Sequence, residues 1–355
     1  MSEPDAPAPP RSHHAPELSV VIPCYNEEES LPQLVDVLSR ELPALVSSYE
    51  VILVDDGSRD RTLPMLRAIS REHPQFRYLA LSRNFGKESA MLAGLSHAHG
   101  DKVAIMDADL QHPPELLAQM LPMLDGETQQ VVARRTRDDD PALRTFLSKT
   151  YYRLINRLVD VDLEDGVGDF RVLDRTAVQA LLTLGETNRF SKGLFAWIGF
   201  DTAVVDYKNV SRAAGTTKWR MTDLFNYGID GVVSFNYRPL RLSIWFGVLV
   251  TAIAVVYALW VLGEAILHGN TVPGYVTLIC AISGFGGVQM ILLGVIGEYL
   301  GRIYAETKRR PLFLLKEASP GSPIAVTTAL GPEHEDRFAA YRTDIDPSRD
   351  RSEDA

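Results

Sequence analysis

Two long uncharged stretches constrain this chain more than any other feature. No Asp, Glu, Lys or Arg occurs between Leu242 and Gly263 or between Asn270 and Gly297. About 20 apolar residues are enough to cross the ~30 Å hydrocarbon core of a bilayer, and a buried helix of a soluble domain rarely stays uncharged for that length. The sequence therefore predicts a hairpin of two transmembrane helices over residues 241–311, with the lipid bilayer as a partner.

Basic residues around the hairpin predict its orientation. Arg238 and Arg241 precede the first stretch, Arg302 and residues 308–310 follow the second, and the connection 264–274 has no Lys or Arg. Basic residues near transmembrane helices are retained on the cytoplasmic side. We therefore expect a multi-pass protein of the inner (plasma) membrane, with the region before the hairpin and both termini in the cytoplasm.

The two ends of the chain are polar. Residues 1–16 contain five prolines, and residues 312–355 are rich in Pro, Ser, Asp and Glu. Such segments cannot bury enough apolar surface to fold alone, so both are predicted to be disordered tails. The formal net charge of −10 argues against nucleic acid as a partner.

The region between residues 17 and 218 alternates apolar strands with amphipathic helices, which is typical of a layered α/β domain. Strands are expected over 18–22, 50–54, 76–81 and 103–106, and a polar cluster follows each strand. Ligand sites of parallel α/β sheets lie beyond the carboxyl ends of the strands. The four clusters are Pro23-Cys24-Tyr25-Asn26-Glu27, Asp55-Asp56-Gly57-Ser58, Ser82-Arg83-Asn84-Phe85-Gly86-Lys87 and Asp107-Ala108-Asp109-Leu110-Gln111.

The last cluster is a candidate metal site. In an extended strand, residues two apart point the same way, so Asp107, Asp109 and Gln111 can converge on one point. Hard oxygen ligands suit Mg²⁺ or Mn²⁺. The alternative is a pair of solvated carboxylates that cap the next helix.

Together the four clusters suit a nucleotide. Carboxylates such as Asp55 and Asp56 match base N–H groups and ribose hydroxyls, and Lys87 matches a diphosphate. Taken singly, the first pair is an ordinary turn and Lys87 an ordinary helix start. Neither a Gly-x-Gly-x-x-Gly fingerprint nor a phosphate-loop lysine motif is present, so the usual dinucleotide and ATPase interpretations lose support.

These motifs resemble those of family 2 glycosyltransferases of the GT-A fold. Residues 81–88, 109–113, 168–171 and 294–302 are also similar to the polyprenyl-phosphate glycosyltransferases, which include bactoprenol glucosyltransferases and dolichol-phosphate mannose synthases. The resemblance extends from about Leu18 to Pro311. It implies an α/β GT-A (Rossmann-like) catalytic domain over 17–218.

The resemblance also implies roles for individual residues. The metal ligands would be Asp107, Asp109 and Gln111, and the first two would be catalytic through the ion. Asp169 either orients the sugar or acceptor, as a catalytic residue, or is an ordinary strand carboxylate. The nucleotide-sugar pocket would be formed by Pro23, Tyr25, Asn26, Glu27, Asp55, Asp56, Lys87 and Asp107.

Basic residues are expected to hold the acceptor phosphate. In the related synthases an Arg and an Arg-x-x-x-Ser pair bind it, and Arg135, Arg144 and Ser148 match that pattern, with Arg134 as an alternative for the first. Arg171, Arg212 and Lys218 could add to an anion-binding surface beside the membrane. Outside this family context each would be read as a solvated surface charge.

Residues 219–240 form the predicted link to the membrane. Apolar residues recur there at helical spacing, so the segment is either core beneath the domain or, as we favour, an amphipathic helix in the membrane interface.

The sequence therefore predicts an inverting, metal-dependent transfer of a hexose, with glucose from UDP-glucose favoured, to a polyprenyl phosphate. Mannose or an amino sugar is the alternative donor, and a non-catalytic nucleotide-sugar binder is the alternative class. A processive polysaccharide synthase would carry a Gln-x-x-Arg-Trp motif, which is absent. Relatives include tetramers and monomers, and Gly284, Gly286 and Gly287 permit the close helix contact of a homo-oligomer.

Overall fold

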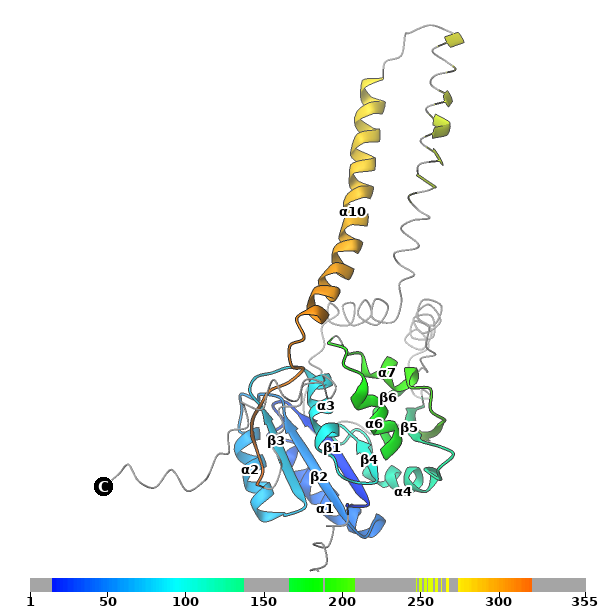
Figure 1. Cartoon of the computed structure of the whole chain (residues 1–355). Coiled ribbons are helices and arrows are strands. Elements are labelled where there is room, and N and C mark those ends of the chain that lie inside the picture. The colour runs from blue at the N-terminus through cyan, green and yellow to red at the C-terminus, as the bar shows by residue number, and fades with distance from the viewer. Residues whose placement is uncertain are drawn as a thin grey trace, which may run out of the picture.

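The computed structural model describes residues 15–136, 166–187, 189–207 and 274–320, together with isolated residues between 247 and 267. Its centre is an eight-stranded mixed sheet in the order β7-β5-β6-β4-β1-β2-β3-β8 (Figure 1). Helices cover both faces, so the core lies in two layers, one on each side of the sheet. The predicted α/β class of the domain is confirmed.

Four strands form the parallel half of the sheet. Their side chains are buried almost throughout, which explains the continuous apolar runs in the sequence. The strands are β1 (Leu18–Cys24), β2 (Tyr49–Asp55), β3 (Phe76–Leu81) and β4 (Lys102–Ile105). The connecting helices are α1 (Leu31–Leu45), α2 (Thr62–Glu72) and α3 (Lys87–His97). Helices α1 and α2 cover one face and α3 the other.

The second half changes direction. Strand β6 (Val167–Asp174) lies antiparallel between β4 and β5 (Gln130–Arg135), and β7 (Thr202–Tyr207) adds a parallel edge beside β5. The remaining short helices are η1 (Pro114–Leu116), α4 (Leu117–Met120), η2 (Leu121–Met123), α6 (Arg175–Thr183) and α7 (Ser191–Trp197). Because β6 runs against β4, the start of β6 lies next to the end of β4.

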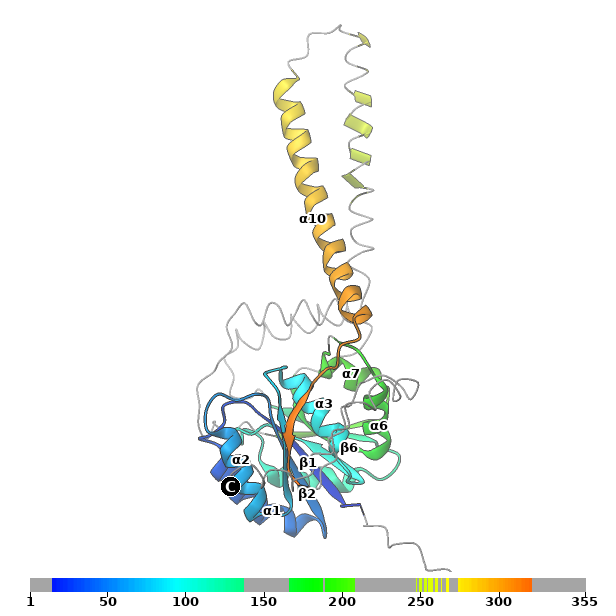
Figure 2. The same cartoon turned by 60° about the vertical axis from the view of Figure 1, so that its left-hand side comes forward.

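Helix α10 (Tyr275–Thr307) projects away from this domain (Figures 1 and 2). Its 33 residues correspond to about 50 Å of helix at 1.5 Å per residue. Among the described residues, the segment Gly284–Thr307 is the one helix long and apolar enough to cross a membrane. The other expected span falls largely outside the described residues, as does the expected interfacial segment 219–240, so the two-helix hairpin stays a prediction.

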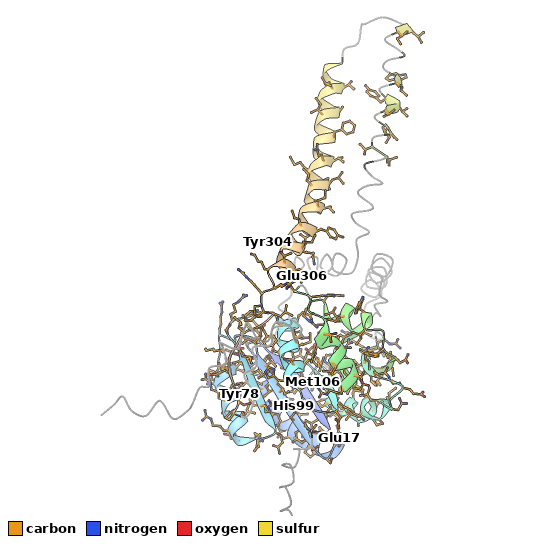
Figure 3. All side chains as sticks on the ribbon, in the orientation of Figure 1. Glu17, Tyr78, His99, Met106, Tyr304 and Glu306 are labelled. Atoms are coloured by element: carbon orange, nitrogen blue, oxygen red, sulfur yellow. The ribbon has the colours of Figure 1, made fainter. Side chains whose placement is uncertain are left out.

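After α10 the chain returns to the sheet. Strand β8 (Leu315–Ala318) pairs antiparallel with β3, and the N–H of Ser82 donates to the carbonyl of Leu314 at 2.8 Å. The carboxyl edge of the parallel strands is therefore the edge nearest the end of α10. At that end Glu306, labelled in Figure 3, accepts from the backbone N–H and the hydroxyl of Thr187 at 2.7 and 3.0 Å.

The expected disordered tail from residue 312 is wrong over its first residues. Leu312 and Phe313 are buried, and Glu317 on β8 forms a two-pronged ion pair with Arg67, with N to O distances of 2.7 and 2.8 Å. The segment was missed because Leu315–Ala318 forms a short edge strand with mixed polarity, and its partner strand lies far away in the sequence.

A tight junction between the β2–α2 turn and the loop after β3 gives a test of the fold. Gly57 has φ of +66°, and a Cβ there would lie 2.5 Å from the backbone carbon of Arg83. Gly126 has φ of +95° with nothing within 4 Å, so it serves as a matched control. Alanine in the left-handed region costs about 1–2 kcal/mol at either site. The clash should add about 1–3 kcal/mol at Gly57.

We therefore expect Gly57→Ala to lower the thermal unfolding midpoint of the detergent-purified protein clearly more than Gly126→Ala does. Equal losses in the two variants would mean that the turn and the loop do not pack this closely.

Candidate active site

The ends of β1, β2 and β4 and the loop after β3 converge on one cleft with a volume of about 320 Å³. Seven of the residues predicted to form the site line it: Pro23, Tyr25, Glu27, Asp56, Lys87, Asp107 and Asp109. Cys24, Asn84, Gly86 and Ala108 complete the lining. Residues at the predicted strand ends thus form the cleft, and Asn84, for which no role was predicted, lies among them.

The turn after β2 is held together by buried carboxylates. Asp56 accepts the backbone N–H groups of Phe85 and Gly86 at 2.7 and 2.9 Å, and Asp55 accepts that of Ser58 at 3.2 Å. Burial raises the pKa of both Asp55 and Asp56. Asp56 still reaches the cleft, whereas Asp55 is not among its lining residues. Both oxygens of Asp56 are used to position the loop that carries Lys87.

Asn26 has a supporting place. Its φ of 55° is unusual for a residue other than glycine, and its side-chain oxygen accepts the N–H of Arg59 at 2.9 Å. Its own N–H donates to the hydroxyl of Ser58 at 3.0 Å. Asn26 therefore joins the loop after β1 to the turn after β2, while its neighbours Tyr25 and Glu27 face the cleft.

Lys87 connects two carboxylates of the site, those of Asp107 and Asp169. Its Nζ lies 2.6 Å from Oδ1 of Asp107 and 2.6 Å from Oδ2 of Asp169. The register of β4 with β6 pairs Ile105 with Arg171, so continuing it by two residues sets Asp107 opposite Asp169. The structure thus brings Asp169 to the site through the antiparallel pairing.

The charges in this cluster shift each other's protonation. Burial alone would raise the pKa of Asp169, but Lys87, Lys192 and Arg171 outweigh it and hold the pKa at about 2. Burial alone would lower the pKa of Lys87, but Asp107 and Asp169 outweigh it and keep the pKa above its ordinary value. Asp169 is therefore ionised and Lys87 protonated throughout the neutral range.

Arg171 lies in the interior, not on the open surface that we expected. Its guanidinium carbon is 3.5 Å from the centroid of the Phe195 ring, and its side chain donates to the carbonyl of Gly168 at 3.0 Å. Burial lowers its pKa to about 10. The buried guanidinium stacks on Phe195, and the positive charge of Arg171 helps to lower the pKa of Asp169.

Two further polar residues were missed by the sequence reasoning. Glu88 accepts hydrogen bonds from both the backbone N–H and the hydroxyl of Ser191, and burial raises its pKa to about 7. His112 is packed against the rings of Phe170 and Tyr207, with centroid distances of 5.2 and 5.6 Å. Burial lowers the pKa of His112. Neither residue follows a strand end in a way that sequence spacing could reveal.

The oxygen-rich lining suits a divalent cation. Glu27, Asp56, Asp107 and Asp109 face the cleft, where Lys87 is the one Lys or Arg among the lining residues. Hard carboxylate oxygens are what Mg²⁺ and Mn²⁺ prefer, and the ammonium of Lys87 already acts as a cation between two of the carboxylates of the site.

Two of the three predicted metal ligands, Asp107 and Asp109, line the cleft. Gln111 is outside the cleft lining, and its backbone N–H donates to Asp109 at 3.1 Å. Among the described residues, no group of three His, Cys, Asp or Glu side chains is placed to hold a metal ion. The metal therefore stays a prediction, with Asp107 and Asp109 as its best-placed ligands.

The predicted acceptor residues are only partly visible. Arg144, Ser148, Arg212 and Lys218 lie outside the described residues. Arg134 and Arg135 end β5, and the guanidinium of Arg134 donates to both oxygens of Asp206 at 2.7 and 3.0 Å.

Comparison with known proteins agrees with this arrangement. Residues 19–182 match the model of glycosyl transferase family 2, and residues 238–303 match that of the GtrB C-terminal hairpin. The provisionally named glycosyltransferase CsbB of Bacillus subtilis (strain 168) is 47% identical over 314 residues, which cover 88% of this chain and 95% of that protein.

Two more distant similarities complete the comparison. The prophage bactoprenol glucosyl transferase homolog of Escherichia coli (strain K12) is 38% identical over 84% of this chain and 98% of its own length. The solved mannosyltransferase PcManGT from Pyrobaculum calidifontis is 17% identical, with a TM-score of 0.43 over 79% of this chain and 88% of that one.

The family 2 match includes the strands whose ends form the cleft, and the hairpin match includes most of α10. Relatives that are 36–38% identical are named bactoprenol glucosyl transferase or its homolog, and the similarity covers nearly their whole length. The chain therefore belongs to the family 2 glycosyltransferases of GT-A type, in the group of the polyprenyl-phosphate glycosyltransferases, and it is an enzyme.

Proposed function

We propose that this enzyme transfers glucose from UDP-glucose to a polyprenyl phosphate, such as undecaprenyl or dolichyl phosphate, on the cytoplasmic leaflet, with Mg²⁺ or Mn²⁺. The observation that carries the proposal is the acidic cleft at the strand ends, on the edge of the sheet nearest α10. Relatives named bactoprenol glucosyl transferase support the choice of sugar and lipid class.

The charge of the cleft supports a role for the metal. Among the described residues, four carboxylates and one lysine line it, so these residues present a net negative charge to a nucleotide diphosphate. Asp107 and Asp109 would hold the divalent cation, which when bound neutralises the departing diphosphate. Lys87 adds the one fixed positive charge in the lining.

The acceptor requires little proton chemistry. A lipid phosphate oxygen is already anionic near neutral pH, so it does not need the strong general base that a sugar hydroxyl needs. It attacks the anomeric carbon in line, a new carbon–oxygen bond forms to the lipid phosphate, and the bond to the nucleotide diphosphate breaks, which inverts the centre.

Asp169 fits a positioning role in this scheme. With its pKa held at about 2 it is a poor proton acceptor. Its contact with Lys87 instead orients that ammonium within the site. Arg171, which stacks on Phe195, adds a positive charge that helps to keep Asp169 ionised.

A donor screen tests the proposal. Purified enzyme with undecaprenyl phosphate should convert radiolabelled UDP-glucose into lipid-linked glucose, and EDTA should abolish the product because the diphosphate then meets uncompensated carboxylates. GDP-mannose and UDP-N-acetylglucosamine serve as parallel donors. Transfer from one of these but not from UDP-glucose would overturn the assignment of the sugar, and full turnover in EDTA would overturn the role of the metal.

The two arginines that end β5 test the acceptor site. The resemblance to the lipid-phosphate synthases favours Arg135, with Arg134 as the alternative, and the guanidinium of Arg134 donates to Asp206. Losing a charge-assisted contact to a phosphate costs about 1.5–3 kcal/mol. Arg135→Ala should therefore lower kcat/KM for the lipid phosphate about ten- to a hundredfold and change the KM for UDP-glucose by less than about threefold. Arg134→Ala is the matched control and should have little effect on either substrate. The opposite pattern would place the acceptor beside Arg134.

The membrane arrangement is tested by labelling. We propose two spans with both termini and the catalytic domain in the cytoplasm, as the flanking basic residues favour. In a chain with Cys24 and Cys280 replaced, Asn270→Cys should react with an impermeant maleimide added to intact cells. Ser322→Cys should react only after the cells are permeabilised. Labelling of the second site alone from outside would refute this orientation.

A further inference from the structure

The ammonium of Lys87 occupies a place suited to a bound cation. Its Nζ lies 2.6 Å from one oxygen of Asp107 and 2.6 Å from one oxygen of Asp169. Asp107 follows the end of β4 and Asp169 lies in the neighbouring antiparallel strand β6; their side chains are 29% and 17% exposed, while that of the lysine is 43% exposed. Of the two carboxylates that Lys87 contacts, we assign Asp107 to the metal but not Asp169.

The helix that carries Lys87 does not by itself favour a positive charge at this position. Lys87 is the first residue of α3, where the helix dipole disfavours a positive charge. The preceding residues Phe85 and Gly86 are fixed by their hydrogen bonds to Asp56. The chain thus holds a cation at an unfavourable helix position, and the two carboxylates compensate for it.

We propose that Lys87 is a resident counter-ion that makes metal binding depend on the nucleotide. In the donor-free enzyme the ammonium of Lys87 contacts the carboxylate of Asp107. A divalent cation that binds without a nucleotide therefore has to compete with this ammonium for Asp107. A nucleotide diphosphate offers Lys87 phosphate oxygens as new partners, and charge-assisted contacts of this kind are strong. Lys87 then leaves Asp107 to the metal while Asp169 keeps it at the site. This inference rests on the proposed function, since it assumes a diphosphate donor.

Binding measurements test the inference without turnover. The free Mn²⁺ signal in electron paramagnetic resonance, corrected for the Mn²⁺ that the same UDP concentration binds without protein, gives the Mn²⁺ affinity of the purified full-length protein with and without UDP. For the wild type, UDP should tighten Mn²⁺ binding at least about tenfold, within the usual range of coupling between two ligands. Equal Mn²⁺ affinity with and without UDP would overturn the proposal, whatever the variants do.

Substitutions assign the effect to Lys87. Lys87→Met keeps the length of the side chain without the charge, so it should bind Mn²⁺ without UDP at least about tenfold more tightly than the wild type, with a smaller effect of UDP. Lys87→Arg keeps the charge and should resemble the wild type. Adding Asp109→Asn to Lys87→Met should remove the gain, because the ion then lacks one of its expected ligands. Unchanged or weaker Mn²⁺ binding by a folded Lys87→Met would overturn the proposal.

The two proposals can fail separately. Thermal unfolding establishes that each variant is folded, and Lys87→Gln replaces Lys87→Met if the latter is not. If UDP tightens Mn²⁺ binding in the wild type and Lys87→Met shows the expected gain, but no glucose is transferred, the sugar assignment fails and the role of Lys87 stands. If glucose is transferred but Mn²⁺ binds equally well without UDP, the role of Lys87 fails and the proposed function stands.

Discussion

The carboxylate of Asp56 is the contact on which the geometry of the site depends. It is 3% exposed, and a buried carboxylate is tolerated only when its oxygens are hydrogen-bonded. Here both oxygens accept backbone N–H groups, from Phe85 and Gly86. The end of β2 is thereby fixed to the loop after β3, where Gly57 lets the two backbones approach closely. Lys87 follows directly, so its position is determined before any substrate contact is made.

The sheet determines which carboxylates Lys87 can reach. A fully parallel sheet would place strand ends at one edge, but it would not bring the start of a strand there. The antiparallel insertion of β6 does so, and it sets Asp169 opposite Asp107. The same edge is tied to α10 through Glu306 and through β8, which pairs with β3. The anionic cleft and the apolar helix are therefore held on the same side of the domain.

Local patterns predicted the parts of this fold that local physics controls. The four parallel strands were found within two residues at each end because burial on both faces makes each a continuous apolar run, and the polar residues that end them formed the cleft. Pairings between distant segments were not predictable. Lys87 meets Asp169 across 82 residues, and β8 joins Arg67 across 250. Arg171 was misplaced on the surface because its burial depends on Phe195, which no spacing connects to it.

The charges of the cleft impose one demand on its chemistry. Both proposed substrates are anionic, and the part of the lining that the structure describes has more carboxylates than cations. Against these described residues, either substrate gains from additional positive charge. Lys87 alone cannot meet this demand, because Asp107 and Asp169 already share its charge. A site of this kind favours a donor that brings its own cation and a separate basic contact for the acceptor. In the proposed arrangement, the cleft would bind the donor and Arg135 at the end of β5 would bind the acceptor phosphate, with the anomeric carbon between them.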